Sequence, residues 1–349
     1  MTRRHGIVFA CVLIGALILD AAPASAHGTG GPPASNFHTV LQGLDPRSPG
    51  VEVRLGPDDE QMELEVTGTA EVTVIGYDHE PYLRITKRGV YENQKSRAVV
   101  INQSRIMTSV PVPIRRGPPK WVKVSSEPVV RWHDHRVHWM GGSTPASVVK
   151  DPDHAHVIQS WSIPLRVDGR SVAIQGTLRW EPPPAAWAWW LVAAGAAGAV
   201  LLGLRTPRRG IVLAATLAVM GLSETLHLWG SWPFTPGSTL DRIAEALPSL
   251  AAVAACVGAV AWLRFRGAAA AAPGILIAGL FIAVSGGLAD LPILSHSWIP
   301  SRLDPDGARV LVALALGLGA ATTIFGVTHL RPPRPVSTPE PDLGTTTTG

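Results

Sequence analysis

The residues best suited to chemistry in this chain are the histidines between positions 131 and 156. Positions 131–140 are Arg-Trp-His-Asp-His-Arg-Val-His-Trp-Met, and Asp-Pro-Asp-His-Ala-His follows at 151–156. Five of the chain's twelve histidines therefore lie within 24 residues. Neutral imidazole is the commonest protein ligand for borderline metals. We therefore predict a metal site built from some of these five histidines: His133, His135, His138, His154 and His156.

A histidine at a new N-terminus would add a sixth ligand. The chain opens with a short basic segment, an apolar run over 7–19 and Ala24-Ser25-Ala26, which together are typical of a cleaved signal peptide over 1–26. Cleavage after Ala26 would expose His27, whose α-amino and ring nitrogens can chelate one ion as a histidine brace. Cu(II) favours such tetragonal nitrogen ligation, so copper is the expected cofactor. Cleavage after Ala24, or an uncleaved first helix, would abolish the brace.

Cysteine usage limits the ligands that such a site can have. Cys11 lies in the leader and Cys256 in a later apolar run, so residues 27–185 contain no thiol. An exported domain without cysteine has no disulfides. Its metal site must use nitrogen and oxygen donors, with or without methionine.

The elements expected to position the histidines are short strands. Alternating or apolar runs separated by Gly, Pro and Asp predict an all-β domain over 27–185, most simply an immunoglobulin-like sandwich. Two smaller β units, divided at the proline-rich piece over 110–120, are the alternative. The predicted strands are 37–41, 51–55, 62–66, 71–75, 82–85, 99–102, 121–124, 129–137, 157–167 and 172–180.

Strand alternation constrains which histidines can act together. In one continuous strand over 129–139, His133 and His135 share a face about 7 Å apart, whereas His138 lies on the other face. Only a turn at Asp134-His135 would bring the two faces to one site. His154 and His156 have the same spacing, so two such pairs could face one another. Asp134 could orient a ligand ring through its free N–H.

The same residues also allow a site without metal. Trp132 and Trp139 could be core aromatics, with the histidines hydrogen-bonded nearby or titrating as a pH sensor. Arg136 would oppose a cation, and Asp134 could simply pair with Arg136.

Residues 186–330 predict a membrane domain. Five apolar runs of about the 20 residues that a bilayer requires lie at 186–204, 211–229, 244–263, 274–291 and 308–328. Arginines cluster after the first, third and fifth runs, which by the positive-inside rule places those loops and the tail over 331–349 in the cytoplasm. We therefore expect a multi-pass cell-membrane protein whose β domain is extracytoplasmic and whose tail is disordered.

Ionisable residues within predicted spans are candidate functional groups. Glu224 and His227 lie one turn apart in the second span, Asp290 lies near the end of the fourth, and His296 follows it. All four fall on the side expected to face the β domain, and we predict that they form a polar pocket there. The simpler interpretation is that they cap helix ends near water.

Three segments resemble an uncharacterised group of actinobacterial membrane proteins. They are Gly-Tyr-Asp-His-Glu-Pro-Tyr-Leu-Arg-Ile at 76–85, Gly-Val-Tyr-Glu-Asn at 89–93 and Trp-His-Asp-His-Arg-Val-His-Trp-Met at 132–140. The likeness transfers no catalytic residues. The order of leader, N-terminal histidine, β domain and membrane helices also resembles the layout of the CopC and CopD copper-resistance proteins.

Together these patterns predict metal binding or handling, most simply of copper, by a membrane-anchored β domain with the lipid bilayer and copper-handling proteins as partners. The alternative is a non-catalytic envelope sensor or assembly module that binds a protein or polymer. No Gly-x-Ser-x-Gly, His-Glu-x-x-His or phosphate-binding glycine loop occurs, so we expect no enzyme of those classes. A formal charge of +4, largely from loop arginines, gives no sign of nucleic-acid binding.

Overall fold

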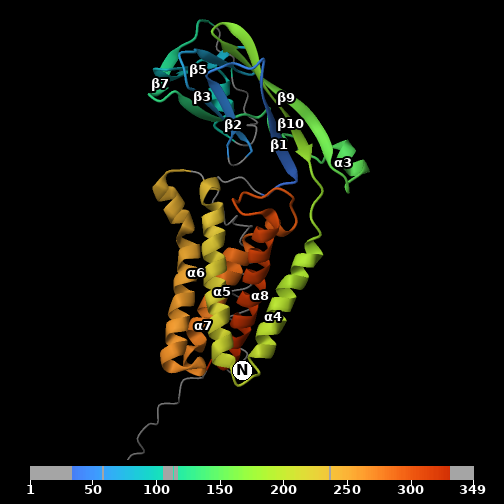
Figure 1. Cartoon of the computed structure of the whole chain (residues 1–349), viewed down its shortest axis with the longest axis vertical. Helices are drawn as coiled ribbons and strands as arrows, with labels where there is room; N and C mark the ends of the chain where they lie inside the picture. Colours follow the sequence, from blue (N-terminus) through green and yellow to red (C-terminus); the bar gives the residue numbers. More distant parts are fainter. Residues whose placement is uncertain (1–33, 57–58, 105–112, 114–116, 236, 331–349) are drawn as a thin grey trace, which may run out of the picture.

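The computed structural model describes residues 34–56, 59–104, 113, 117–235 and 237–330. It has an antiparallel β region followed by a helical region with five long apolar helices (Figure 1). The predicted signal peptide, His27 and the tail over 331–349 lie outside the described residues, so the predictions about them stay predictions.

The strands of the β region form two antiparallel sheets. The larger has seven strands in the order β1-β10-β9-β4-β5-β6-β7, and the smaller has the order β2-β3-β8. Their bounds are β1 (Phe37–Asp45), β2 (Val51–Leu55), β3 (Gln61–Val66), β4 (Val72–Ile75), β5 (Pro81–Thr86), β6 (Gly89–Asn93), β7 (Trp121–Ser125), β8 (Val129–His133), β9 (His156–Val167) and β10 (Arg170–Trp180).

Both sheets contribute to one hydrophobic core. In β3 the apolar residues Met62, Leu64 and Val66 are buried and the intervening glutamates are less so, because successive side chains point to opposite faces. They belong to the same buried cluster as Val74 of β4 and Ile163 of β9, which lie in the larger sheet. The two sheets therefore pack on each other, whereas an immunoglobulin-like connectivity stays a prediction.

Three sequence-based assignments in the β region were wrong. Residues 99–102 are not a strand: Ser96 accepts a hydrogen bond from the Ala98 N–H (3.1 Å), and the short helix α2 (Ala98–Ile101) follows despite its β-branched residues. Residues 89–93 are the unpredicted strand β6. Strand β8 ends at His133, and the chain turns at Asp134 instead of continuing to residue 137.

The helical region contains the five expected apolar helices. They are long and apolar enough to cross a membrane, and each predicted span overlaps one of them. Their bounds are α4 (Ala186–Gly203), α5 (Arg209–Ser231), α6 (Thr239–Arg266), α7 (Ala268–Ile282), which continues into the π-helix η2 (Ala283–Leu288), and α8 (Pro305–His329).

The two regions meet at one joint. Ser35, just before β1, exchanges two backbone hydrogen bonds with Trp298 (3.0 and 2.8 Å), which lies between α7 and α8. Next to it, the Asn36 side chain accepts a hydrogen bond from the Ser297 N–H (2.9 Å). The buried Arg309 of α8 holds this segment by donating to the carbonyl oxygen of His296 (2.8 Å). Figure 1 shows β1 and β10 both reaching the helices here.

Candidate metal centre

The site begins with a turn that Asp134 closes. Its carboxylate is fully buried and accepts hydrogen bonds from the Trp132 indole (3.0 Å) and from Arg136 Nε and a terminal guanidinium nitrogen (2.8 and 2.7 Å). Its backbone carbonyl accepts from the Val137 N–H (3.1 Å). The turn reverses the chain directly after β8, which a continuous strand could not do.

Tyr77, which precedes β5, fixes the turn from the other sheet. Its hydroxyl accepts a hydrogen bond from the His135 N–H (3.0 Å) and donates to the Asn102 side chain (2.5 Å). Burial, reinforced by the nearby charge of Asp134, raises the pKa of Tyr77 above its ordinary value, so the hydroxyl stays neutral. Nothing in the sequence pattern marked Tyr77 as part of the site. Its role depends on a contact 58 positions away along the chain, between His135 and Tyr77.

Because the chain turns, three histidines converge. One ring nitrogen from each of His133, His135 and His138 lies within 4.8 Å of the others. The Nε2 atoms of His133 and His138 are 2.9 Å apart, so one donates a hydrogen bond to the other. Nitrogens bound to one metal at about 2.0–2.1 Å lie roughly 3 Å apart in neighbouring positions. The prediction that His138 lies on the opposite face from His133 was therefore wrong.

His135 is set up as a ligand by its second nitrogen. Its Nε2 lies 2.8 Å from the carbonyl oxygen of Ser104. A carbonyl only accepts, so Nε2 carries the proton and Nδ1 has a free lone pair. Nδ1 is buried and has no hydrogen-bond partner among the described residues. A histidine that binds a metal through one nitrogen commonly donates its other N–H to a carbonyl in this way.

His133 favours the neutral form of its ring. Burial lowers the pKa of His133 to about 4, and the adjacent His138 ring contributes in the same direction. Neutral imidazole is the form that binds metal. At neutral pH, His133 therefore needs to lose no proton before it can act as a ligand.

A groove gives access to the cluster. It has a volume of about 490 Å³, and His135 and His138 form part of its wall together with Met140 and residues 159–162 of β9. It lies in the part of the β region nearest the helices, because Trp139 stacks on Phe37 (ring centroids 5.5 Å apart) and Thr39 donates to the Val137 carbonyl (2.5 Å). Phe37 and Thr39 lie at the start of β1, directly after the joint.

The other predicted ligands do not join this cluster. His154 is exposed and pairs with the carboxylate of Asp151 (2.7 Å), which raises the His154 pKa. His156 lies 2.6 Å from the backbone oxygen of Asp151. The expectation that the two His-x-His pairs face one another is therefore not met. His27 lies outside the described residues.

Asp134 does not orient a ligand ring as predicted. Its oxygens are occupied by Trp132 and Arg136, and Ser104 takes the predicted role toward His135. Burial opposes the charge on Asp134, but the Arg136 hydrogen bonds and charge outweigh it and lower the pKa of Asp134. The simple Asp134–Arg136 pair is therefore the correct interpretation. It also neutralises the cation next to the histidines.

Three of the four predicted polar residues of the helical region are close together. His227 of α5 forms an ion pair with Asp290 (3.1 Å), and Glu224 accepts a hydrogen bond from Ser285 of η2 (3.3 Å). A Cβ atom at Gly286 would lie 2.1 Å from the Glu224 carboxylate, so the π-helix presents a glycine where Glu224 needs space. A cavity of about 30 Å³, large enough for about one water, adjoins His227. His296 instead contacts the Pro292 carbonyl (2.7 Å).

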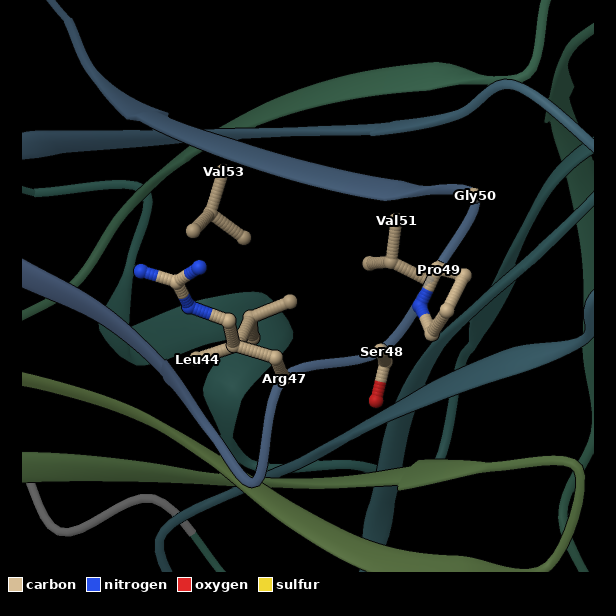
Figure 2. Close-up of a pocket in the computed structure, with 7 residues that line it drawn as sticks. All are labelled: Leu44, Arg47, Ser48, Pro49, Gly50, Val51 and Val53. Atoms are coloured by element: carbon tan, nitrogen blue, oxygen red, sulfur yellow. The ribbon is translucent and has the colours of Figure 1, made fainter.

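A second hollow in the β region offers no comparable chemistry. It has a volume of about 430 Å³ and lies where β1 connects to β2 (Figure 2). Figure 2 shows the Arg47 side chain on the side of Val53, with the Ser48 hydroxyl pointing away from them. Its lining is apolar apart from these two side chains, and neither is a usual metal ligand.

The likeness to the actinobacterial group and to the copper-resistance layout stays an expectation from sequence. Fold alone would not assign a function, so the assignment depends on the site itself. Comparison of the chain with protein-family models, with curated proteins and with solved structures finds no match.

Proposed function

We propose that this protein binds a transition metal, copper in preference to others, at His133, His135 and His138, and holds or delivers it at the outer face of the cell membrane. The observation that supports this most is the buried Nδ1 of His135, which has no partner among the described residues while Nε2 is held by Ser104. A buried nitrogen without a partner is costly in a purely structural cluster. A bound metal would satisfy it.

The choice of copper and of the outer face follows from the sequence. Three imidazoles without a thiol suit copper, which stands at the top of the stability order for divalent first-row metals. Loop arginines at 205, 208, 209, 264 and 266 favour a cytoplasmic location for the end of the helices away from the β region. The resemblance in layout to copper-resistance proteins points the same way, and His27 would supply further nitrogens if the leader is cleaved before it.

Metal titration of the purified full chain in detergent tests the proposal. We expect one Cu(II) to bind at neutral pH, and alanine at His133, His135 or His138 to lower its affinity by at least about 10-fold. His154→Ala is the matched control, since that exposed ring lies outside the cluster, and it should leave the affinity unchanged. His27→Ala, with N-terminal sequencing, tests the brace separately.

Two results would overturn the proposal. One is that the full chain takes up neither copper nor zinc at neutral pH. The other is that metal binds with the same affinity after all three cluster histidines have been replaced.

Glu224, His227 and Asp290 are the groups that we propose receive or sense the ion in the helical region. Glu224 and Asp290 are buried among the helices and His227 is partly buried, and such burial, which is expensive for ionisable groups in a membrane, supports a functional role. His296 remains a candidate at the joint. If these groups act after the β region, then Glu224→Gln should reduce copper tolerance of cells without changing copper affinity at the histidine cluster.

A second candidate function is an envelope module that binds a protein partner. Strand β7 is an edge of the larger sheet, and its Val122 and Val124 are 41% and 53% exposed. An exposed apolar edge strand can pair with another extended chain. Photocrosslinking from position 124 would capture such a partner, and metal binding would then be dispensable for the capture.

A further inference from the structure

Three histidines leave at least one position open on a metal that takes four ligands. We propose that the thioether of Met140 fills it, so that the site binds Cu(I) with three nitrogens and one sulfur. This inference rests on the proposed function and specifies the metal and its oxidation state. Met140 is partly buried and lines the same groove as His135 and His138.

Met140 lines the groove next to the histidine cluster. Trp139, which also lines the groove, stacks on Phe37 at the edge of the core. Gly141 leaves space for that ring, because a Cβ atom there would lie 2.1 Å from Trp139 Cζ2. Met140 follows His138 by two positions and shares the lining of the groove with it.

The other side chains of the groove are poorer candidates. Arg136 has no acceptor atom and is paired with Asp134, and the Trp161 indole is a donor only. Gln159 donates a hydrogen bond from its amide nitrogen to the Arg136 carbonyl (3.2 Å). Only its side-chain oxygen, a hard donor, is then left to bind a metal. Ser160 and Ser162 offer neutral hydroxyls. Among the described residues that line the groove, Met140 is thus the one soft donor.

A thioether changes which ion the site prefers. Thioether sulfur selects Cu(I), whereas it adds little to the binding of harder ions. A site with only three imidazoles would also suit zinc. Met140 would therefore distinguish copper from zinc.

The test compares Met140→Leu with the wild-type full chain in detergent under anaerobic conditions. Leucine conserves the volume of methionine and removes the sulfur. Cu(I) affinity is measured against a chromogenic Cu(I) chelator, Zn(II) affinity by competition with a zinc chelator, and copper ligation by X-ray absorption. Met220→Leu is the control, because Met220 is buried among the helices and lies outside the groove.

We expect a sulfur neighbour at about 2.3 Å from copper in the wild type and in Met220→Leu, and none in Met140→Leu. Cu(I) affinity should fall at least about 10-fold in Met140→Leu, and Zn(II) affinity should change by less than about threefold. Copper bound by nitrogen alone, with equal affinity in Met140→Leu, would overturn this inference and leave the proposed function intact. Failure of the wild type to bind copper or zinc would overturn both.

Discussion

At the scale of single residues, the arrangement of the three histidines depends on a buried charge outside their cluster. Asp134 is fully buried, and Arg136 exposes a fifth of its side chain. Asp134 joins Trp132 at the end of β8 to Arg136 within the turn, and Arg136 also lies over the Tyr77 ring, 4.8 Å from its centroid. The positions of His135 and His138 therefore depend on this ion pair.

Replacing Asp134 by asparagine should be costly. The substitution conserves shape but leaves the Arg136 guanidinium buried without its counter-charge, and we expect a loss of about 2–4 kcal/mol in the free energy of unfolding. Glu63→Gln is the matched control. Its partners Arg54 and Arg131 are 54% and 65% exposed, so the loss there should stay below about 1 kcal/mol. Chemical denaturation of the full chain in detergent measures both, and equal losses would contradict this role of Asp134.

His38 provides a pH-dependent contact at the start of β1. Its Nδ1 lies 2.6 Å from the carboxylate of Asp59. That hydrogen bond raises the pKa of His38, and partial burial opposes the rise. The charged pair therefore stabilises the fold fully below the unfolded value of about 6.5, and this contribution is lost as the pH rises through the raised pKa of the folded state.

Asp59→Asn should reveal this dependence. Asp59 has a positive φ of 55°, which asparagine tolerates well, so the change removes little besides the charge. The wild type should melt above the variant at pH 5.5, by no more than about 4 °C for so exposed a pair, and the gap should close by pH 8.5. A gap that widens with rising pH would show that the pair does not act in this way. Metal-free protein is used at both pH values.

At the scale of elements, hydrophobic periodicity predicted the regular helices and most strands, but it missed the turn that ends β8. The five long helices and most strands follow from apolar runs, because hydrophobic pattern depends on neighbours along the chain. The turn after His133 does not follow from such a pattern. It is set by Tyr77 and Ser104, which are distant in sequence, so a strand pattern over 129–137 gave the wrong partner for His133. The sequence could identify His133, His135 and His138 as candidate ligands, but it could not predict that they converge.

Gly141 offers a test of how the loop after the turn is positioned. Gly141→Ala would place a methyl group against the Trp139 ring, so we expect a loss of stability of about 1–3 kcal/mol. Metal affinity should also fall by at least about 10-fold, because His138 and Met140 flank Trp139. Gly142→Ala is the neighbouring control, since nothing lies within 4 Å of the added methyl group. Metal affinity that is unchanged in Gly141→Ala would mean that Trp139 does not position the site.

At the scale of the whole molecule, the histidine cluster lies in the β region, and Glu224, His227 and Asp290 lie near the end of the helices that faces it. Figure 1 shows the β region above one end of the helices, with the connection between α4 and α5 at the opposite end. Loop charge predicts that this opposite end is cytoplasmic. The distribution of loop charges is read from the sequence, and labelling determines on which side of the membrane each loop lies.

Cysteine labelling in intact cells measures the sidedness. Ser143 in the β region and Thr206 between α4 and α5 are both exposed, and the chain's own thiols are only Cys11 and the buried Cys256. A membrane-impermeant maleimide should label Ser143→Cys in intact cells and Thr206→Cys only after lysis. The reverse pattern would place the histidine cluster in the cytoplasm. The Cys256→Ala background serves for both variants.

The joint also brings the two ends of the β region together. The backbone N–H of Glu181, directly after β10, donates to the carbonyl oxygen of Asn36, directly before β1 (2.8 Å), so the β region begins and ends at the same place. A segment whose two ends are adjacent can be inserted or removed without changing the distances between the elements that remain. Recombination could therefore exchange the β region for another module without rearranging the five helices. The β region and the helical region need not have a common history.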